Sequence, residues 1–326
     1  MFGSDGIPDR VVEKILTFSK YRTVLTLRQV NQQFRNFIDD SKNSDVISDS
    51  HLSGIDLTAR ENCIDLSFYS DEGSSSIQYK REENENANFI ERTMIDLGQM
   101  LKLQKSTMNY FTLNMNLNPE NQEVNPIAKT LPERLTNLLE SGTPRLIRTR
   151  QLSLLVFTED QLMAILPFVD SNELRRIYIA FDAQRSVNFG MSEIVKTEQW
   201  KSAKELYMRP QEFSADLENL AHFSRSRVCF QRLTSEDLDF LRKMFSNSSN
   251  FLEFDGYSKE FDSFENLETL WGMAAQQWNE YSFWYFTFSG SEDVMKIKFC
   301  RLETLSCFNI LRIDSDDVPS SVVVKE

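Results

Sequence analysis

The chain has 326 residues, of which 40% are hydrophobic and 25 are phenylalanine, so it exceeds one average domain of roughly 100 to 200 residues and has ample core material. Its formal net charge of −13 disfavours binding to DNA or RNA, because basic side chains supply most nonspecific affinity for phosphates. It has no apolar run of about 18 residues and no charged-then-apolar leader after Met1, which argues against a membrane span or secretion and predicts a cytoplasmic or nuclear protein.

Residues 7–39 have the pattern of three short helices. Pro8 suits the start of a helix, because its fixed φ fits that position and its missing N–H would be unsatisfied there anyway. Apolar residues then recur at spacings of three and four on both sides of a break at residues 19–21. A domain of roughly 40 residues without disulfide or metal usually needs a partner to complete its core. We therefore expect an apolar face that a second polypeptide or the next domain covers.

The order of residues in this segment resembles an F-box. Two departures are Ile7 in place of the usual Leu and Asn31 where Cys or Ser is more common. F-boxes dock on the Skp-family adaptor of cullin-RING ubiquitin ligases, so the resemblance implies the same contact here. The residues it implies are Ile7, Pro8, Val12, Ile15, Leu16, Leu25, Leu27, Val30 and Phe34. The structural alternative is a helical cap that only seals the following domain. We place the end of this first domain after residue 48.

The second domain, residues 49–326, begins with alternating strand and helix signals. Residues 63–69 and 76–80 alternate in hydrophobicity around a turn, which predicts a pair of strands. Residues 88–103 carry a helical stripe of apolar side chains, and residues 110–115 again have strand character. The pattern is typical of an α/β domain.

A loose repeat follows. Strand-like runs begin 22 to 29 residues apart, each before a segment of helical periodicity, at residues 152–157, 176–181, 205–209 and 227–231. Repeats of this length with one strand and one helix predict a degenerate leucine-rich-repeat-like α/β solenoid. Thr158 with Gln161 and Thr234 with Asp237 fit capping boxes. A doubly wound sheet is the alternative, and we prefer the solenoid because the spacings are short and no phosphate-binding turn is present.

Two stretches of this region, EQWKSAKEL at residues 198–206 and LENLAHF at residues 217–223, resemble the FTH domain that follows the F-box in the nematode F-box A family. The similarity extends over about residues 90 to 255. An F-box followed by an FTH domain is the arrangement of that family, so each half supports the other. The resemblance implies a substrate adaptor whose second domain selects a client.

Tryptophan and histidine residues of the second domain could serve in binding or catalysis, but their positions in the sequence favour structural roles. We expect Trp200 to be a core anchor whose indole N–H reaches a carbonyl, and His222 to be a hydrogen-bonded structural residue. Residues 267–278 form a helical face, and residues 281–288 and 294–301 predict a β-hairpin that caps the solenoid. The weak candidates for client binding, should they be exposed, are Trp271, Trp278 and Trp284.

The sequence offers little material for catalysis. It has four scattered cysteines without a Cys-x-x-Cys pair, two histidines, and none of the glycine-rich, Gly-x-Ser-x-Gly or His-Glu-x-x-His motifs. We therefore expect no metal, no cofactor and no enzymatic activity, and keep an α/β enzyme as the remote alternative.

The sequence thus predicts a noncatalytic adaptor of a ubiquitin ligase. A Skp-family adaptor, and through it a cullin, would bind the first domain, and a protein client of unknown identity would bind the second. The net charge alone would favour a basic client. A scaffold that bridges proteins without their degradation is the milder alternative.

Overall fold

The structure is a computed structural model that describes residues 6–43, 45–81, 88–115, 126–141, 146–156, 158–180, 190–302 and 304–325. Within these ranges the chain is α/β, which confirms the predicted class. It divides into two compact units: unit 1 is Met1–Leu152 with Ala164–Leu174, and unit 2 is Ser153–Met163 with Arg175–Glu326. The predicted boundary after residue 48 lies inside unit 1 and stays a prediction.

Unit 1 begins with the N-terminal module, three short helices: α1 (Asp9–Thr17), α2 (Tyr21–Val30) and α3 (Gln32–Asp39), followed by the 3₁₀ turn η1 (Ser41–Asn43). Pro8 is the N-cap of α1 rather than its first helical residue. Asn31 caps α3, because its side-chain oxygen accepts the backbone N–H groups of Gln33 and Phe34 at 2.8 and 3.2 Å. The unusual Asn at this position therefore starts a helix. The buried apolar residues of the module are Val12, Leu16, Tyr21, Val24, Phe34 and Ile38.

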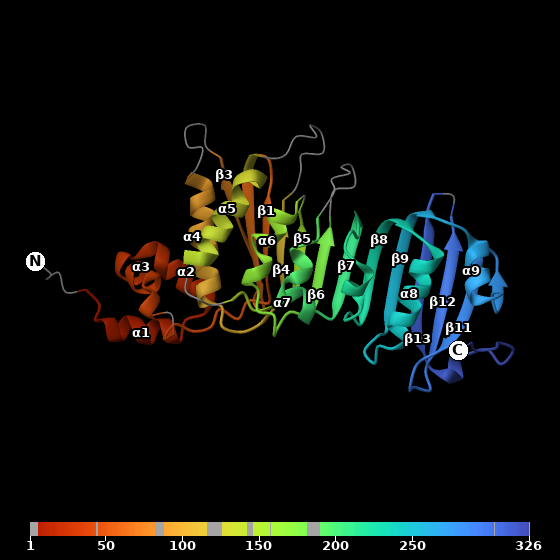
Figure 1. Ribbon diagram of the computed structural model, residues 1–326. Helices are drawn as coiled ribbons and strands as arrows, with labels where there is room; N and C mark the ends of the chain where they lie inside the picture. Colours follow the sequence, from red (N-terminus) through yellow and green to blue (C-terminus); the bar gives the residue numbers. More distant parts are fainter. Residues whose placement is uncertain are drawn as a thin grey trace, which may run out of the picture. The chain divides into compact units, whose positions relative to one another are not determined.

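The sheet of unit 1 has the strand order β4-β1-β2-β3. The bounds are β1 (Gly54–Ala59), β2 (Cys63–Ser70), β3 (Gly73–Lys80) and β4 (Met108–Asn114). β1 pairs antiparallel with β2 and parallel with β4, and β2 pairs antiparallel with β3. Helix α4 (Asn88–Leu103) packs on β2 and β3, and α5 (Pro126–Ser141) packs on α4 (Figure 1). The 3₁₀ turn η2 (Leu166–Phe168) completes this unit. Strand β5 (Thr149–Leu155) begins in unit 1 and ends in unit 2.

Unit 2 has a mixed sheet in the order β10-β11-β12-β13-β9-β8-β7-β6. Its parallel strands are β6 (Arg176–Ala180), β7 (Glu205–Glu212), β8 (Arg225–Leu233) and β9 (Glu253–Phe261). Its antiparallel strands are β10 (Gln276–Trp278), β11 (Tyr281–Thr287), β12 (Val294–Arg301) and β13 (Ser306–Ile313). Three strands of the predicted repeat, β6, β7 and β8, lie in chain order and pair in parallel, whereas the solenoid itself stays a prediction.

Most helices and 3₁₀ turns of unit 2 connect its strands, and Figure 1 shows α8 and α9 on one face of the sheet. Their bounds are α6 (Glu159–Met163), η3 (Ile194–Lys196), α7 (Glu198–Ser202), η4 (Leu217–Leu220), α8 (Ser235–Ser246), α9 (Phe264–Trp271) and η5 (Ser315–Asp317). The predicted capping box of α8 is confirmed, since the Thr234 and Asp237 side chains each accept the other's backbone N–H. Alternate strand residues such as Val228 and Phe230 are buried, while their neighbours Arg227 and Cys229 are half-exposed. One face of the sheet therefore forms the core of unit 2.

The C-terminal prediction is right in one part and wrong in another. The hairpin of β11 and β12 is present at the end of the sheet, and β13 and β9 extend it into a larger antiparallel section, while its role as a cap stays a prediction. The predicted helix over residues 267–278 ends at Trp271, because Gly272 adopts a φ of +72° and the chain turns into β10. Phe157 and Phe181, the last residues of two predicted strands, lie outside the described residues.

Candidate functional site

The outer side of α1 carries a row of exposed apolar side chains. Val11 and Ile15 stand four residues apart on one side of α1, and the exposed Ile7 and Phe18 flank the two ends of the helix. Phe18 has 76% of its surface exposed, and at the end of α2 Val30 has 72%. Exposed apolar side chains that gather in one part of the surface, unlike single ones, are a feature of protein-binding sites. We call Ile7, Val11, Ile15, Phe18 and Val30 the N-terminal apolar surface.

The residues predicted to bind the Skp-family adaptor separate into three groups. Ile7, Pro8, Ile15 and Val30 are exposed, and Leu25 and Leu27 are half-buried. Val12, Leu16 and Phe34 are buried inside the module, so they hold its helices together and have no free surface for a partner. The helical period of the sequence identified exposed and buried residues alike, because the inner and the outer stripe of α1 are both apolar.

Two exposed residues of this surface, Val11 and Phe18, were missing from the predicted set. Phe18 follows the last turn of α1, with the ammonium of Lys14 at 5.7 Å from its ring centre. Its spacing of three from Ile15 was the signal in the sequence that could have identified it.

Ionic contacts tie the module to the rest of unit 1. The Arg28 guanidinium on α2 donates to the Asp39 carboxylate at 2.7 Å and to the Asp96 carboxylate on α4 at 3.2 Å. Asp96 also accepts the Tyr79 hydroxyl of β3 at 2.6 Å. Burial and this hydrogen bond raise the pKa of Tyr79, which keeps the phenol protonated as a donor. Because Arg28 is mostly buried, this network is screened less than a surface ion pair.

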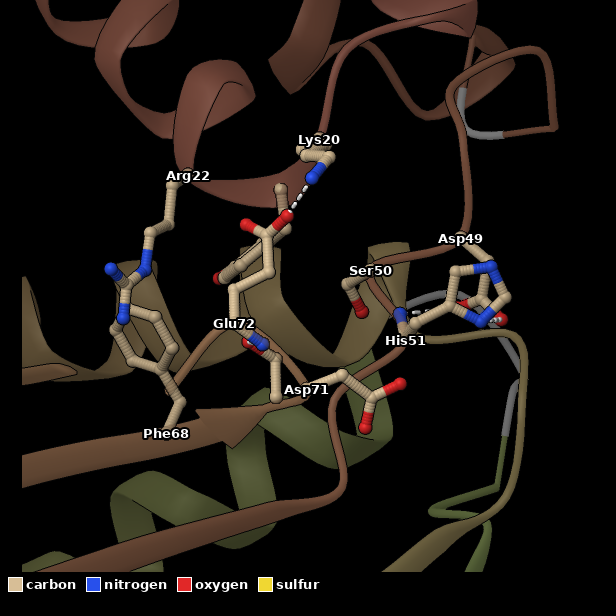
Figure 2. Close-up of a pocket in the computed structure, with 10 residues that line it drawn as sticks. Lys20, Arg22, Asp49, Ser50, His51, Phe68, Asp71 and Glu72 are labelled. Atoms are coloured by element: carbon tan, nitrogen blue, oxygen red, sulfur yellow. Dashed lines mark hydrogen bonds and ion pairs between the residues drawn. The ribbon is translucent and has the colours of Figure 1, made fainter. Parts of the chain in front are cut away.

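A pocket of about 410 Å³ lies where the module meets the turn between β2 and β3. Figure 2 shows the Lys20 ammonium, just before α2, paired with the Glu72 carboxylate of that turn. The Tyr21 ring meets the Phe68 ring edge-on at 5.5 Å, and Arg22 donates to the Ser74 carbonyl at 2.9 Å. The pocket lining carries charges of both signs, and several of its side chains join the module to the sheet.

Asp49 fixes the segment that leads out of the module. Its carboxylate accepts the backbone N–H groups of Lys105 at 2.8 Å, Ser106 at 2.9 Å and His51 at 3.2 Å. Burial disfavours its charged form, but these hydrogen bonds outweigh burial and hold the pKa of Asp49 below its ordinary value of 3.8.

This environment predicts a pH-dependent contribution to stability. A carboxyl whose pKa is lowered by folding stabilises the protein above the unfolded value and loses that effect as pH falls through the folded value. We expect Asp49→Asn to lower the free energy of unfolding by about 2 kcal/mol at pH 7, because hydrogen bonds to a charged group are lost. Urea unfolding followed by far-UV circular dichroism should show this difference shrinking below pH 3.8, the ordinary value of the carboxyl. A difference that stays constant to pH 2.5 (roughly one unit lower) would contradict this assignment.

Trp200 and His222 have the structural roles that the sequence predicted. Trp200 is buried in unit 2, and its indole N–H donates to the Asn219 carbonyl at 3.2 Å. The ring meets Phe223 edge-on at 5.1 Å. His222 contacts the Trp200 carbonyl through Nε2 at 2.8 Å, and burial lowers the pKa of its imidazole. Both residues join α7 to the η4 segment.

The three tryptophans considered for client binding lie in different environments. Trp271 and Trp284 are buried and pack edge-on at 5.4 Å, with indole N–H groups donated to Asp239 and to the Gly272 carbonyl. The proposal that they are exposed anchors is therefore corrected, because neither has surface to offer. Trp278 has 70% of its surface exposed at the edge strand β10, and it remains a candidate.

The described ranges contain no group of three or more His, Cys, Asp or Glu side chains that could hold a metal ion. Nor does any helix in those ranges have the length and apolarity to cross a membrane.

Parts of the chain are similar to a known domain family and to a protein of a nematode. The FTH domain matches residues 129–270 of the chain. F-box A protein 224 of Caenorhabditis elegans is 23% identical over 244 residues, which cover 70% of this chain and 59% of that relative. The match thus spans less than two thirds of the relative's length. No solved structure matches the chain.

Proposed function

Because the chain is a member of the F-box A proteins that carry an FTH domain, we propose that its N-terminal module is an F-box and that it serves a cullin-RING ubiquitin ligase as the substrate-recognition adaptor. The module would bind a Skp-family adaptor and through it a cullin, and the domain after residue 48 would hold a protein client. Such a protein accelerates ubiquitin transfer by holding the client near the enzyme and needs no catalytic residues of its own.

The N-terminal apolar surface is the observation that carries the docking half of this proposal. Val12, Leu16 and Phe34 already fill the inside of the module, so the exposed row on α1 and Val30 on α2 are surplus to its own core. A helical cap would turn such side chains towards the domain that it seals. Exposed apolar side chains gain free energy when a partner covers them, at about 25 cal/mol per Å².

The first experiment asks whether the purified full chain forms a stable complex with a Skp-family adaptor. We expect the two to elute together in size-exclusion chromatography and to recruit a cullin when it is added. Failure of the two proteins to bind at micromolar concentrations would reject the F-box assignment.

A second experiment separates degradation from bridging. Proximity labelling from the full chain in cells should identify neighbouring proteins, with and without a proteasome inhibitor. Clients that are degraded should accumulate when the proteasome is inhibited, whereas partners that are only bridged should keep their abundance. The second outcome would favour a scaffold over a degradation adaptor.

A further inference from the structure

The open face of the unit 2 sheet places aromatic and basic side chains side by side. Residues directly opposite on neighbouring strands share a face. Trp278 on β10 stands opposite Tyr281 on β11, and Phe283 on β11 stands opposite Lys298 on β12. Because alternate residues of a strand share a face, Lys296 belongs to the same set. We call Trp278, Tyr281, Phe283, Lys296 and Lys298 the Lys298 face. A pocket of about 410 Å³, lined by Tyr281 and Lys298 among others, lies beside it.

The aromatic rings hold the two ammonium groups in place. The Lys298 ammonium lies 3.9 Å from the centre of the Tyr281 ring, and the Lys296 ammonium lies 5.3 Å from the centre of the Phe283 ring. Cation–π contacts of this kind orient a lysine without neutralising it. Tyr281, Phe283 and both lysines are half-exposed, and Trp278 is mostly exposed, so a partner can reach all five side chains.

The lysines of the Lys298 face lack the ion pairs that arginines on the neighbouring parallel strands have. On the neighbouring parallel strands, Arg176 pairs with Glu205 at 2.5 Å and Arg227 pairs with Asp255 at 2.5 Å. Neither Lys296 nor Lys298 forms an ion pair with any carboxylate among the residues that the structure describes. Both ammonium groups are therefore available to a partner's carboxylates, and the acidic side chains of the adjoining pocket are Glu253 and Asp255.

We propose, on the basis of the adaptor function above, that the Lys298 face is the client-binding surface and that it takes an acidic protein segment carrying an adjacent aromatic or aliphatic side chain. The carboxylates of the segment would meet Lys296 and Lys298, and its apolar side chain would pack on Trp278 and Tyr281. Tryptophan and tyrosine are the residue types that most often dominate binding energy at interfaces.

The local charge of the face and the net charge of the chain favour opposite partners. The net charge of −13 favours a basic client, whereas the two lysines favour an acidic one. Solvent-exposed charges farther apart than about 8 Å are largely screened at physiological ionic strength. The groups in direct contact with the partner therefore decide the sign of its charge.

Selection from a peptide library displayed on phage, with the purified full chain as bait, tests this proposal. We expect the enriched peptides to be acidic and to contain an aromatic or aliphatic residue. Lys296→Ala with Lys298→Ala should weaken binding of an enriched peptide by roughly tenfold in fluorescence anisotropy, since both charge contacts are lost. Trp278→Ala should weaken it by a similar factor, because an exposed aromatic anchor is removed.

The matched control removes two lysines from the helices of unit 2. Lys201 on α7 and Lys243 on α8 are exposed side chains paired with Glu198 and Asp239. The variant Lys201→Ala with Lys243→Ala changes the net charge equally and should change the affinity by less than about twofold, because these lysines lie outside the contact. Enrichment of basic or uncharged peptides, no enrichment at all, or equal losses in both double variants would overturn the proposal.

Binding of the Skp-family adaptor, measured on the same variants, separates this proposal from the adaptor function. Adaptor binding should be unchanged when Lys296 and Lys298 are replaced. A chain that binds the adaptor but selects no acidic peptide rejects the Lys298 face alone. A chain that selects acidic peptides but binds no adaptor rejects the adaptor function and leaves the face as a peptide-binding site.

Discussion

Replacement of Val30 with Asp is expected to weaken binding of a Skp-family adaptor by at least about a hundredfold while the chain stays folded. In the proposed complex the side chain at this position is covered by the partner, and an unpaired charge enclosed there costs several kcal/mol. Since about 1.4 kcal/mol corresponds to a factor of ten in affinity, a loss of two or more orders of magnitude follows. Isothermal titration calorimetry with purified proteins measures the effect.

Val30 is a suitable position because it is exposed in the free chain, so the aspartate stays in water when no partner is bound. Ile15→Asp on α1 should act in the same way. The matched control is Val323→Asp, since Val323 is 77% exposed near the other end of the chain and belongs to no proposed contact. If Val30→Asp and Val323→Asp bound the adaptor equally well, the N-terminal apolar surface would not be the docking site.

Leu16 is a poor position for this test, because the exposure of a side chain in the free chain decides whether an aspartate there is tolerated. Leu16 is fully buried among the helices of the module. An aspartate there would unfold the module, and lost binding would report stability instead of contact. The exposure of each side chain, which the sequence period alone does not give, therefore decides which substitutions are informative.

Local sequence patterns correctly predicted the elements whose apolar spacing fits only a helix or only a strand. The helical stripe over residues 88–103 matches the bounds of α4, and the alternation of residues 63–69 matches β2 to within a residue. The sequence also predicted that the Trp200 indole N–H donates to a carbonyl, because a buried indole N–H usually finds an acceptor.

Elements that depend on distant packing were not predicted. Strand β1 was missed although Ile55, Leu57 and Ala59 alternate and are fully buried. It begins at Gly54, where the ring of Tyr110 on β4 occupies the space that a Cβ would need. The reason for a glycine at this position becomes visible only once β1 is paired in parallel with β4.

The Lys298 face shows the same limit at a candidate site. The sequence indicates that Lys296 and Lys298 share one side of a strand. It does not give the register that sets Lys298 opposite Phe283, nor the turn at Asn279, with a φ of +52°, that brings Trp278 opposite Tyr281. To predict a binding surface on a sheet, the register between neighbouring strands must be known as well as the alternation along each strand.

The largest expected loss of stability is at Trp200. Trp200→Ala should lower the free energy of unfolding of unit 2 by about 4 kcal/mol, because it leaves a large cavity in a close-packed core. Trp200→Phe keeps much of the ring packing on Phe223 but leaves the Asn219 carbonyl without the indole N–H, so a smaller loss of about 1 to 2 kcal/mol is expected.

Urea unfolding followed by tryptophan fluorescence measures this loss, because all four tryptophans belong to unit 2 and their emission reports that unit. The control is Trp278→Ala, which removes the same atoms from an exposed position and should change stability by less than about 0.5 kcal/mol. The two variants also separate the structural tryptophan from the binding one: Trp200→Ala should lower stability first, whereas Trp278→Ala should lower affinity for acidic peptides in a fully folded chain. Equal stabilities for the two variants would mean that α7 and η4 are not joined through the Trp200 ring.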